Sequence, residues 1–230
     1  MTMNRVEFEK SLEDPLSFWG QKTQAEVQQL LGDRVAMMVN YEQRNPHHCY
    51  GLFKHALHTV KGLPEGASVL LKVAAFFHDI GKPEVMQERN GRRVFYGHAR
   101  KSWEIAQGLL PKLGYLPGET EEICFYIKHH DDFIPWFLSE EKIRMTNPIL
   151  REITKKNVKI YMDGVMLEEE IFQHCPNPYG LWMSLLDLSH ADIYAQAERV
   201  YRNGFCVDSR EHKDEKIQRV RELIRRRYQK

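Results

Sequence analysis

Apolar residues recur at spacings of three and four along most of this chain, which is the period of helices that bury one face. Between residues 8 and 39, for example, Leu31, Val35 and Met38 follow that spacing, with breaks at Asp14-Pro15 and Gly32. Strand-like alternation is confined to one short stretch. The pattern predicts further helices near residues 50–62, 69–80, 99–112, 118–130, 139–155 and 180–202.

That short stretch, residues 84–97, predicts a hairpin. Val85–Glu88 and Arg93–Tyr96 flank an Asn90-Gly91 pair, and Asn-Gly favours the tight turns that join two strands. The expected fold class is therefore all-α, a helical bundle with one small β-hairpin.

The pattern divides the chain into an N-terminal helical extension (1–41), a central helical domain (42–205) and a charged C-terminal helix (206–230). The length of 230 residues suits one generous domain with helical extensions. Lys and Arg number 33 against 32 acids, a net charge of +1, so nucleic acid would have to be held by a local patch.

Membrane insertion and secretion find no support in the pattern. No apolar run approaches the roughly 20 residues that span a bilayer. The first twenty residues are charged throughout, unlike a signal peptide, and the four cysteines include no CxxC pair. We expect a cytoplasmic protein with no membrane partner.

Candidate chemistry begins where the most apolar helix ends. Ser68 is an expected N-cap, Val69–Phe77 is apolar apart from one lysine, and His78 and Asp79 follow, with Gly81 expected to end the helix in a left-handed conformation. Burying an unpaired carboxylate beside aromatic rings costs several kcal/mol unless a cation or hydrogen bonds compensate it. A divalent metal would use both groups as ligands, whereas ordinary helix-cap contacts are the alternative.

Other histidines and an acid stand on separate predicted helices. His55, His98 and Asp192 are such groups, and Ile123 and Ile127 place His130, rather than His129, on the apolar face of its helix. A single histidine or aspartate of this kind more often has a purely structural role. Together, at the inner ends of packed helices, they predict a mixed imidazole and carboxylate metal site.

These residues carry a family resemblance. His55, then AAFFHDIGKP at 74–83, FYGH at 95–98, IKHH at 127–130 and ADIYAQ at 191–196, resemble the HD-domain metal-dependent phosphohydrolase superfamily in that order. More narrowly, the chain is similar to the HD module of bacterial CCA-adding tRNA nucleotidyltransferases, and Asn45–His48 fits that subgroup. The resemblance covers about residues 42 to 200.

The resemblance implies residue roles and a cofactor. His55, His78, Asp79 and Asp192 would hold the principal metal; His98 and His130 would hold a second metal bridged by Asp79. Lys82 would contact a substrate phosphate, so the implied catalytic groups are Asp79, Lys82, His98 and His130. The implied cofactor is a divalent ion, Mn, Fe, Co, Ni or Mg, with one or two per chain.

The chain also departs from the family pattern. Ala99 stands where an acid often follows the histidine of the GH motif, and Ala56 stands where a threonine often follows the first ligand. The missing acid removes a partner that would orient His98, which weakens the case for the second metal. The Gly-Ser and paired-Asp signature of the nucleotidyltransferase head does not occur, so we do not expect this chain to add CCA.

The expected function is hydrolysis of a phosphomonoester or phosphodiester, of a nucleotide or cyclic nucleotide, by metal-activated water. The alternative is a non-catalytic HD-fold module that binds tRNA or a nucleotide; a purely structural metal is a third reading. The C-terminal bases, Arg219, Arg221, Arg225, Arg226, Arg227 and Lys230, favour RNA binding. Interleaved acids such as Glu215 and Glu222 favour a solvated face instead, so RNA is the weaker expectation.

Overall fold

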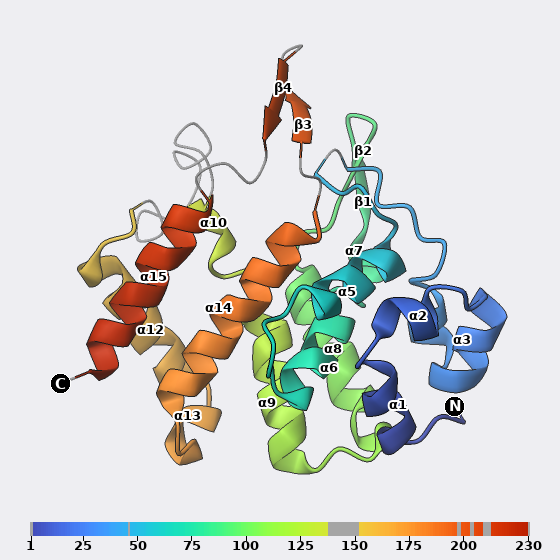
Figure 1. Cartoon of the computed structure of the whole chain (residues 1–230), viewed down its shortest axis with the longest axis horizontal. Coiled ribbons are helices and arrows are strands. Elements are labelled where there is room, and N and C mark those ends of the chain that lie inside the picture. The colour runs from blue at the N-terminus through green and yellow to red at the C-terminus, as the bar shows by residue number, and fades with distance from the viewer. Residues whose placement is uncertain are drawn as a thin grey trace.

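The computed structural model describes residues 2–45, 47–137, 152–196, 199–202, 205–208 and 213–229. These residues are mainly helical, which confirms the all-α class (Figure 1). The helices are α1 (Arg5–Ser11), α2 (Pro15–Trp19), α3 (Gln24–Leu31), α4 (Asp33–Ala36), α5 (Leu52–Lys61), α6 (Val69–Phe77), α7 (Lys82–Val85), α8 (His98–Leu109), the 3-10 turn η1 (Pro111–Leu113), α9 (Pro117–His129), α10 (Ile134–Phe137), α12 (Lys155–Glu168), α13 (Ile171–His174), α14 (Pro178–Tyr194) and α15 (Lys213–Tyr228). The strands are β1 (Gln87–Arg89), β2 (Arg92–Val94), β3 (Arg199–Arg202) and β4 (Phe205–Asp208).

Helix α6 is the centre of the bundle. The Ser68 hydroxyl accepts a hydrogen bond from the Leu71 N–H and caps the helix, as the sequence predicts. Helices α5, α9 and α14 pack around α6, and α8 packs on α9. Because neighbouring helices surround the C-terminal part of α6, all of its residues from Val73 to Phe77 are buried.

The N-terminal helices cover one side of α6. Asn4 and Thr23 form capping boxes at the starts of α1 and α3. Phe8 on α1 packs edge-on against Phe76, with ring centroids 5.2 Å apart, and Trp19 on α2 lies 5.6 Å from the same ring. This aromatic contact joins the extension to the helix that ends in His78 and Asp79.

On the other side, α14 crosses the middle of the molecule, with α12, α13 and α15 beyond it (Figure 1). Helix α15 packs on α14 and α12 and buries Ile217, Val220 and Ile224. The Arg221 guanidinium on α15 lies 2.6 Å from the Asp187 carboxylate on α14. A thin stripe of apolar residues therefore attaches this otherwise charged helix to the bundle.

The predicted hairpin is present. Strand β1 pairs antiparallel with β2, with Arg89 opposite Arg92. Asn90 and Gly91 have φ values of 51° and 71°, and these two positive angles match the tight turn that Asn-Gly favours.

The predicted helix over 180–202 is wrong at its C-terminal end. Helix α14 ends at Tyr194, and residues 199–202 form β3, which pairs antiparallel with β4 so that Val200 lies opposite Val207. Arg199–Arg202 contains a β-branched and an aromatic residue, which suit a strand, and pairing with a later segment overrides a helical period. The fold thus has a second hairpin that the pattern does not predict.

The helix predicted over 139–155 falls mostly on residues 138–151, which lie outside the described residues, and α12 runs beyond it to Glu168. Gly81 is not left-handed, since its φ is −81°. A Cβ at Gly81 would lie 2.5 Å from the Ser102 backbone nitrogen, so glycine is needed there for the close approach of α8.

In the described ranges, no helix combines the length and the apolar character needed to cross a membrane.

Candidate metal centre

Five helices bring six polar side chains together at the centre of the bundle. Asp79 is the shared member, and it is 1% exposed although it carries a carboxylate. Fully buried carboxylates are rare unless they are paired with a cation. We call the whole set the interhelical cluster, and its members are His55 on α5, His78 and Asp79 after α6, His98 at the start of α8, His130 at the end of α9 and Asp192 on α14.

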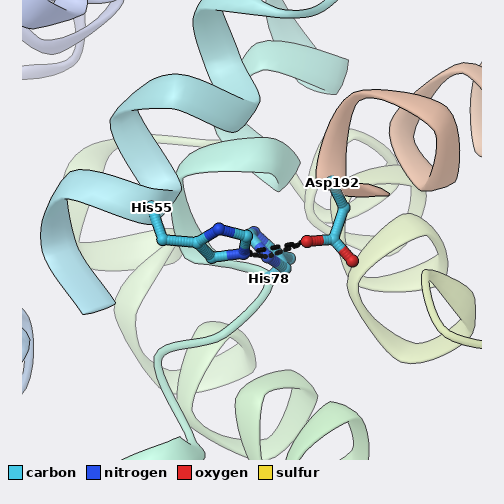
Figure 2. Close-up of side chains that lie close together, drawn as sticks. All are labelled: His55, His78 and Asp192. Carbon is cyan, nitrogen blue, oxygen red and sulfur yellow. Dashed lines mark hydrogen bonds and ion pairs between the residues drawn. The ribbon is translucent and has the colours of Figure 1, made fainter. Parts of the chain in front are cut away.

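One half of the interhelical cluster forms around His55 and His78. His55 Nε2 lies 2.8 Å from Asp192 Oδ1 and 3.3 Å from Asp79 Oδ2. His78 Nε2 lies 3.1 Å from Asp79 Oδ2 and 3.6 Å from Asp192 Oδ1. Figure 2 shows the rings of His55 and His78 pointing at the Asp192 carboxylate from separate elements. We call this half the principal site.

The other half forms around His98 and His130. The two Nε2 atoms are 3.2 Å apart, and Asp79 Oδ1 lies 3.2 Å from His98 Nε2 and 3.8 Å from His130 Nε2. Asp79 therefore directs one oxygen to each half. We call this half the second site.

The histidine Nδ1 atoms determine what the Nε2 atoms can do. The Nδ1–H groups donate to backbone carbonyls: His78 to Ala75 at 2.7 Å, His130 to Ile127 at 2.7 Å and His98 to Phe95 at 2.9 Å. His55 Nδ1 faces the Ala195 carbonyl at 3.3 Å. Since a carbonyl only accepts, each neutral ring keeps its Nε2 lone pair, and that lone pair points into the cluster.

This arrangement fits a metal ion. His55 Nε2 and His78 Nε2 lie 3.3 Å apart, so two lone pairs face each other with no hydrogen atom between the neutral rings. Within the described residues, Asp79 Oδ1 has no donor in hydrogen-bonding geometry, and the cation nearest Asp79 Oδ2 is the Lys82 Nζ, 2.6 Å away. A divalent cation satisfies acceptors that no donor satisfies, and mixed imidazole and carboxylate ligands suit first-row ions.

The charges in the cluster are strongly coupled. Burial alone raises the pKa of Asp79, but the His78 imidazole and the Lys82 ammonium hold that pKa well below its usual value. Burial lowers the pKa of His78, yet Asp79 and Asp192 raise it to about 10. The two carboxylates thus attract positive charge to the cluster, and a metal would compete with protons for the same nitrogens.

Lys82 lies beside this cluster in a buried position. Its Nζ is 2.6 Å from Asp79 Oδ2 and donates to Gln43 Oε1 at 3.0 Å. Gln43 is 1% exposed and also donates to the Tyr50 carbonyl. Sequence reasoning missed Gln43, because a lone glutamine in a loop gives no signal of a contact 39 residues away.

A second residue that sequence reasoning missed is Asp131. It follows His130 directly, and its Oδ2 lies 3.0 Å from His98 Nε2. The available signal was its place in the IKHHD sequence, immediately after a candidate ligand.

His129 faces away from the interhelical cluster. Its Nδ1 lies 2.6 Å from Asp132 Oδ2 and its Nε2 lies 3.1 Å from Glu169 Oε1. The Tyr161 hydroxyl donates to the same Asp132 oxygen at 2.8 Å. We call His129, Asp132, Tyr161 and Glu169 the α9–α12 network. Adjacent histidines thus take part in two separate groups of polar contacts.

Comparison with known proteins agrees with this geometry. The family model of the HD domain matches residues 47–160. A CC-adding tRNA nucleotidyltransferase of Thermus thermophilus is 33% identical over 107 residues, which cover 44% of this chain and 24% of that protein. An A-adding tRNA nucleotidyltransferase of Deinococcus radiodurans is 31% identical over 88 residues, which cover 36% of this chain and 20% of that protein. The matched stretch is therefore a quarter or less of either relative.

Proposed function

Because residues 47–160 are an HD domain, a fold of the metal-dependent phosphohydrolase superfamily, we propose that this chain is itself such an enzyme. Its proposed reaction is hydrolysis of a phosphomonoester or phosphodiester, with a nucleotide or cyclic nucleotide as substrate. One observation carries the proposal: four imidazole Nε2 atoms and the oxygens of Asp79 and Asp192 converge in the interhelical cluster, where Asp79 Oδ1 has no hydrogen-bond donor among the described residues.

The proposed ligands follow from the two sites. His55, His78, Asp79 and Asp192 would hold the principal metal, and His98, His130 and Asp79 a second. A bound divalent ion would lower the pKa of water toward neutrality and offset charge on the phosphoryl group. Mn, Fe, Co, Ni and Mg are the candidate ions.

The remaining roles belong to side chains of this chain. With one metal bound and the second site free of an ion, His98, which at 13% is the most exposed histidine of the cluster, is placed to pass a proton to a leaving group that enters from solvent. The Lys82 Nζ lies 2.6 Å from Asp79 Oδ2, where it would also attract a substrate phosphate. Asp79 and Asp192 would supply the negative charge that retains the cation.

A non-catalytic module that binds tRNA is the second candidate. In its favour, both curated relatives are tRNA nucleotidyltransferases. Against it, part of the basic face of α15 is engaged within the protein, since Arg221 pairs with Asp187 and Arg227 pairs with Asp163. The tRNA proposal therefore rests on the relatives more than on this surface.

The test compares the two candidates directly. We would load the purified chain with each candidate metal and assay a panel of phosphomonoesters and phosphodiesters, with Asp79→Ala as the control and circular dichroism to verify its fold. Metal-dependent turnover that Asp79→Ala abolishes supports the enzyme. Bound metal with no turnover against any substrate overturns it, and RNA binding with a steep salt dependence would then support the module.

A further inference from the structure

Asp131 occupies the turn after α9 and faces the second site. Its Oδ2 lies 3.0 Å from His98 Nε2, and its Oδ1 lies 3.5 Å from His130 Nε2. The side chain is 40% exposed, so it reaches the cluster from the solvent side while the Asp79 carboxylate is buried. One carboxylate therefore contacts both histidines of the second site.

The spacing of these atoms is that of ligands around one ion. Donor atoms at about 2.1 Å from an octahedral cation lie about 3 Å from their neighbours. The two Nε2 atoms are 3.2 Å apart, and Asp79 Oδ1 is 3.2 and 3.8 Å from them. The ligand atoms of His98, His130 and Asp131 all lie within 4.8 Å of one another.

A direct hydrogen bond does not account for this contact when the rings are neutral. His98 and His130 each donate their Nδ1–H to a backbone carbonyl, so neither Nε2 carries a hydrogen for Asp131. Either an extra proton or a metal ion must lie between these atoms. Two carboxylates and two imidazoles around one point favour the divalent ion, whose charge they balance.

We propose that Asp131 is a ligand of a second divalent cation, together with His98, His130 and Asp79 Oδ1. This inference rests on the proposed function for the existence of the second cation. Residue 99, beside His98, is an alanine and supplies no carboxylate. Asp131 brings a carboxylate to His98 from the end of α9 instead. The second site then has four ligands from three separate segments and selects a first-row ion that accepts both nitrogen and oxygen.

The test measures metal binding rather than turnover. Wild type and Asp131→Ala would be titrated with Mn²⁺, with the stoichiometry taken from elemental analysis and the coupling between ions from electron paramagnetic resonance. We expect wild type to bind two ions per chain with a coupled spectrum. Asp131→Ala should keep one ion, lose the coupling and bind the second at least about tenfold more weakly.

Two further variants keep the result interpretable. Asp132→Asn removes the neighbouring negative charge, which faces the α9–α12 network, and should leave the second ion in place. Asp131→Asn preserves shape and should also weaken the second ion, because it removes the charge alone.

Several results would overturn the inference. Unchanged affinity for both ions in Asp131→Ala would do so, as would equal losses in Asp131→Asn and Asp132→Asn. A wild type that binds one uncoupled ion also overturns it, while hydrolysis with a single metal would stand. Conversely, two coupled ions that depend on Asp131, in a protein with no phosphoester turnover, would support this inference and refute the proposed function.

Discussion

His129 and His130 are adjacent at the end of α9, yet their surroundings differ in kind. In the α9–α12 network, both ring nitrogens of His129 face carboxylates, and the Tyr161 hydroxyl satisfies an Asp132 oxygen as well. In the interhelical cluster, His130 Nε2 faces the Nε2 of His98 and the oxygens of two aspartates. The network gives each nitrogen of one imidazole its own carboxylate partner, whereas the cluster directs several Nε2 atoms and carboxylate oxygens at one another, with the Lys82 ammonium at Asp79 Oδ2.

This difference separates a structural histidine from a candidate ligand better than burial does. His129 is 6% exposed and His130 is 1% exposed, so both count as buried. Paired polar groups stabilise the fold and need nothing further. Converging acceptors that lack donors are satisfied by added protons or by a metal ion. The variants below test whether the two groups of residues can be separated by experiment.

The largest expected effect is loss of the shared carboxylate of the cluster. Asp79→Ala removes an oxygen from each site, and without metal activation water is a far weaker nucleophile. We expect turnover to fall by at least about 1000-fold, with metal content lost in parallel. Steady-state kinetics and elemental analysis of the same preparation check both. An Asp79→Ala protein that keeps its metal and its turnover would contradict the central role of this residue.

The second expected effect is on stability, because metal binding should raise the free energy of unfolding. A ligand at 100 times its dissociation constant stabilises the native state by about 2.7 kcal/mol. We expect excess Mn²⁺ to raise the thermal midpoint of wild type and of His129→Ala but to have little effect on His55→Ala. Thermal unfolding with Mn²⁺ or with a chelator measures this. Equal shifts in all three proteins would indicate a metal site elsewhere.

The next largest effect is expected when the α9–α12 network loses its histidine. His129→Ala leaves Asp132 and Glu169 without an imidazole partner, so we expect a loss of about 2 kcal/mol in unfolding free energy. Turnover should stay within about tenfold of wild type, because His129 does not face the cluster. His130→Ala should show the reverse pattern, losing turnover and little stability in metal-free protein. Urea denaturation beside kinetics makes the comparison, and two variants with the same profile would remove the distinction.

The smallest expected effect is the pH dependence of the network. The hydrogen bond from His129 lowers the pKa of Glu169 from 4.5 to about 2, so its contribution is present above pH 4.5 and is lost as pH falls toward 2. Burial lowers the pKa of His129, but Asp132 and Glu169 raise it above 6.5, so its contribution is full below pH 6.5 and is lost at higher pH.

The stability gap between wild type and His129→Ala should therefore be widest between pH 4.5 and 6.5. We expect the gap to narrow by about 1 kcal/mol toward either extreme, since solvent partly screens these charges. Chemical denaturation across the pH range measures it. A gap that does not change with pH would mean that His129 contributes packing alone.

Local signals explain what the sequence predicts well. Asn90-Gly91 specifies its turn, and Ser68 specifies the start of α6, because both act on neighbouring residues. The helical period also predicts the end of α9, and it places His130, rather than His129, on the face that carries Ile123 and Ile127. The metal-binding roles of the predicted site residues stay a prediction until an ion is measured.

Contacts between distant segments explain what the sequence does not predict. Strand β3 forms because Arg199–Arg202 pairs with β4, and the spacing of apolar residues does not predict that pairing. Position 81 requires glycine because Ser102, 21 residues away, packs on its backbone. Gln43 reaches Lys82 in the same way. These contacts depend on how helices approach each other, which residue spacing does not specify.

The most direct test of the central claim is a crystal structure of the chain prepared with excess Mn²⁺, with anomalous data. The account predicts a peak about 2.1 Å from His55 Nε2, His78 Nε2 and one oxygen each of Asp79 and Asp192. The contrary result is no peak in the interhelical cluster, with His55 donating directly to Asp192 and the remaining acceptors satisfied by water.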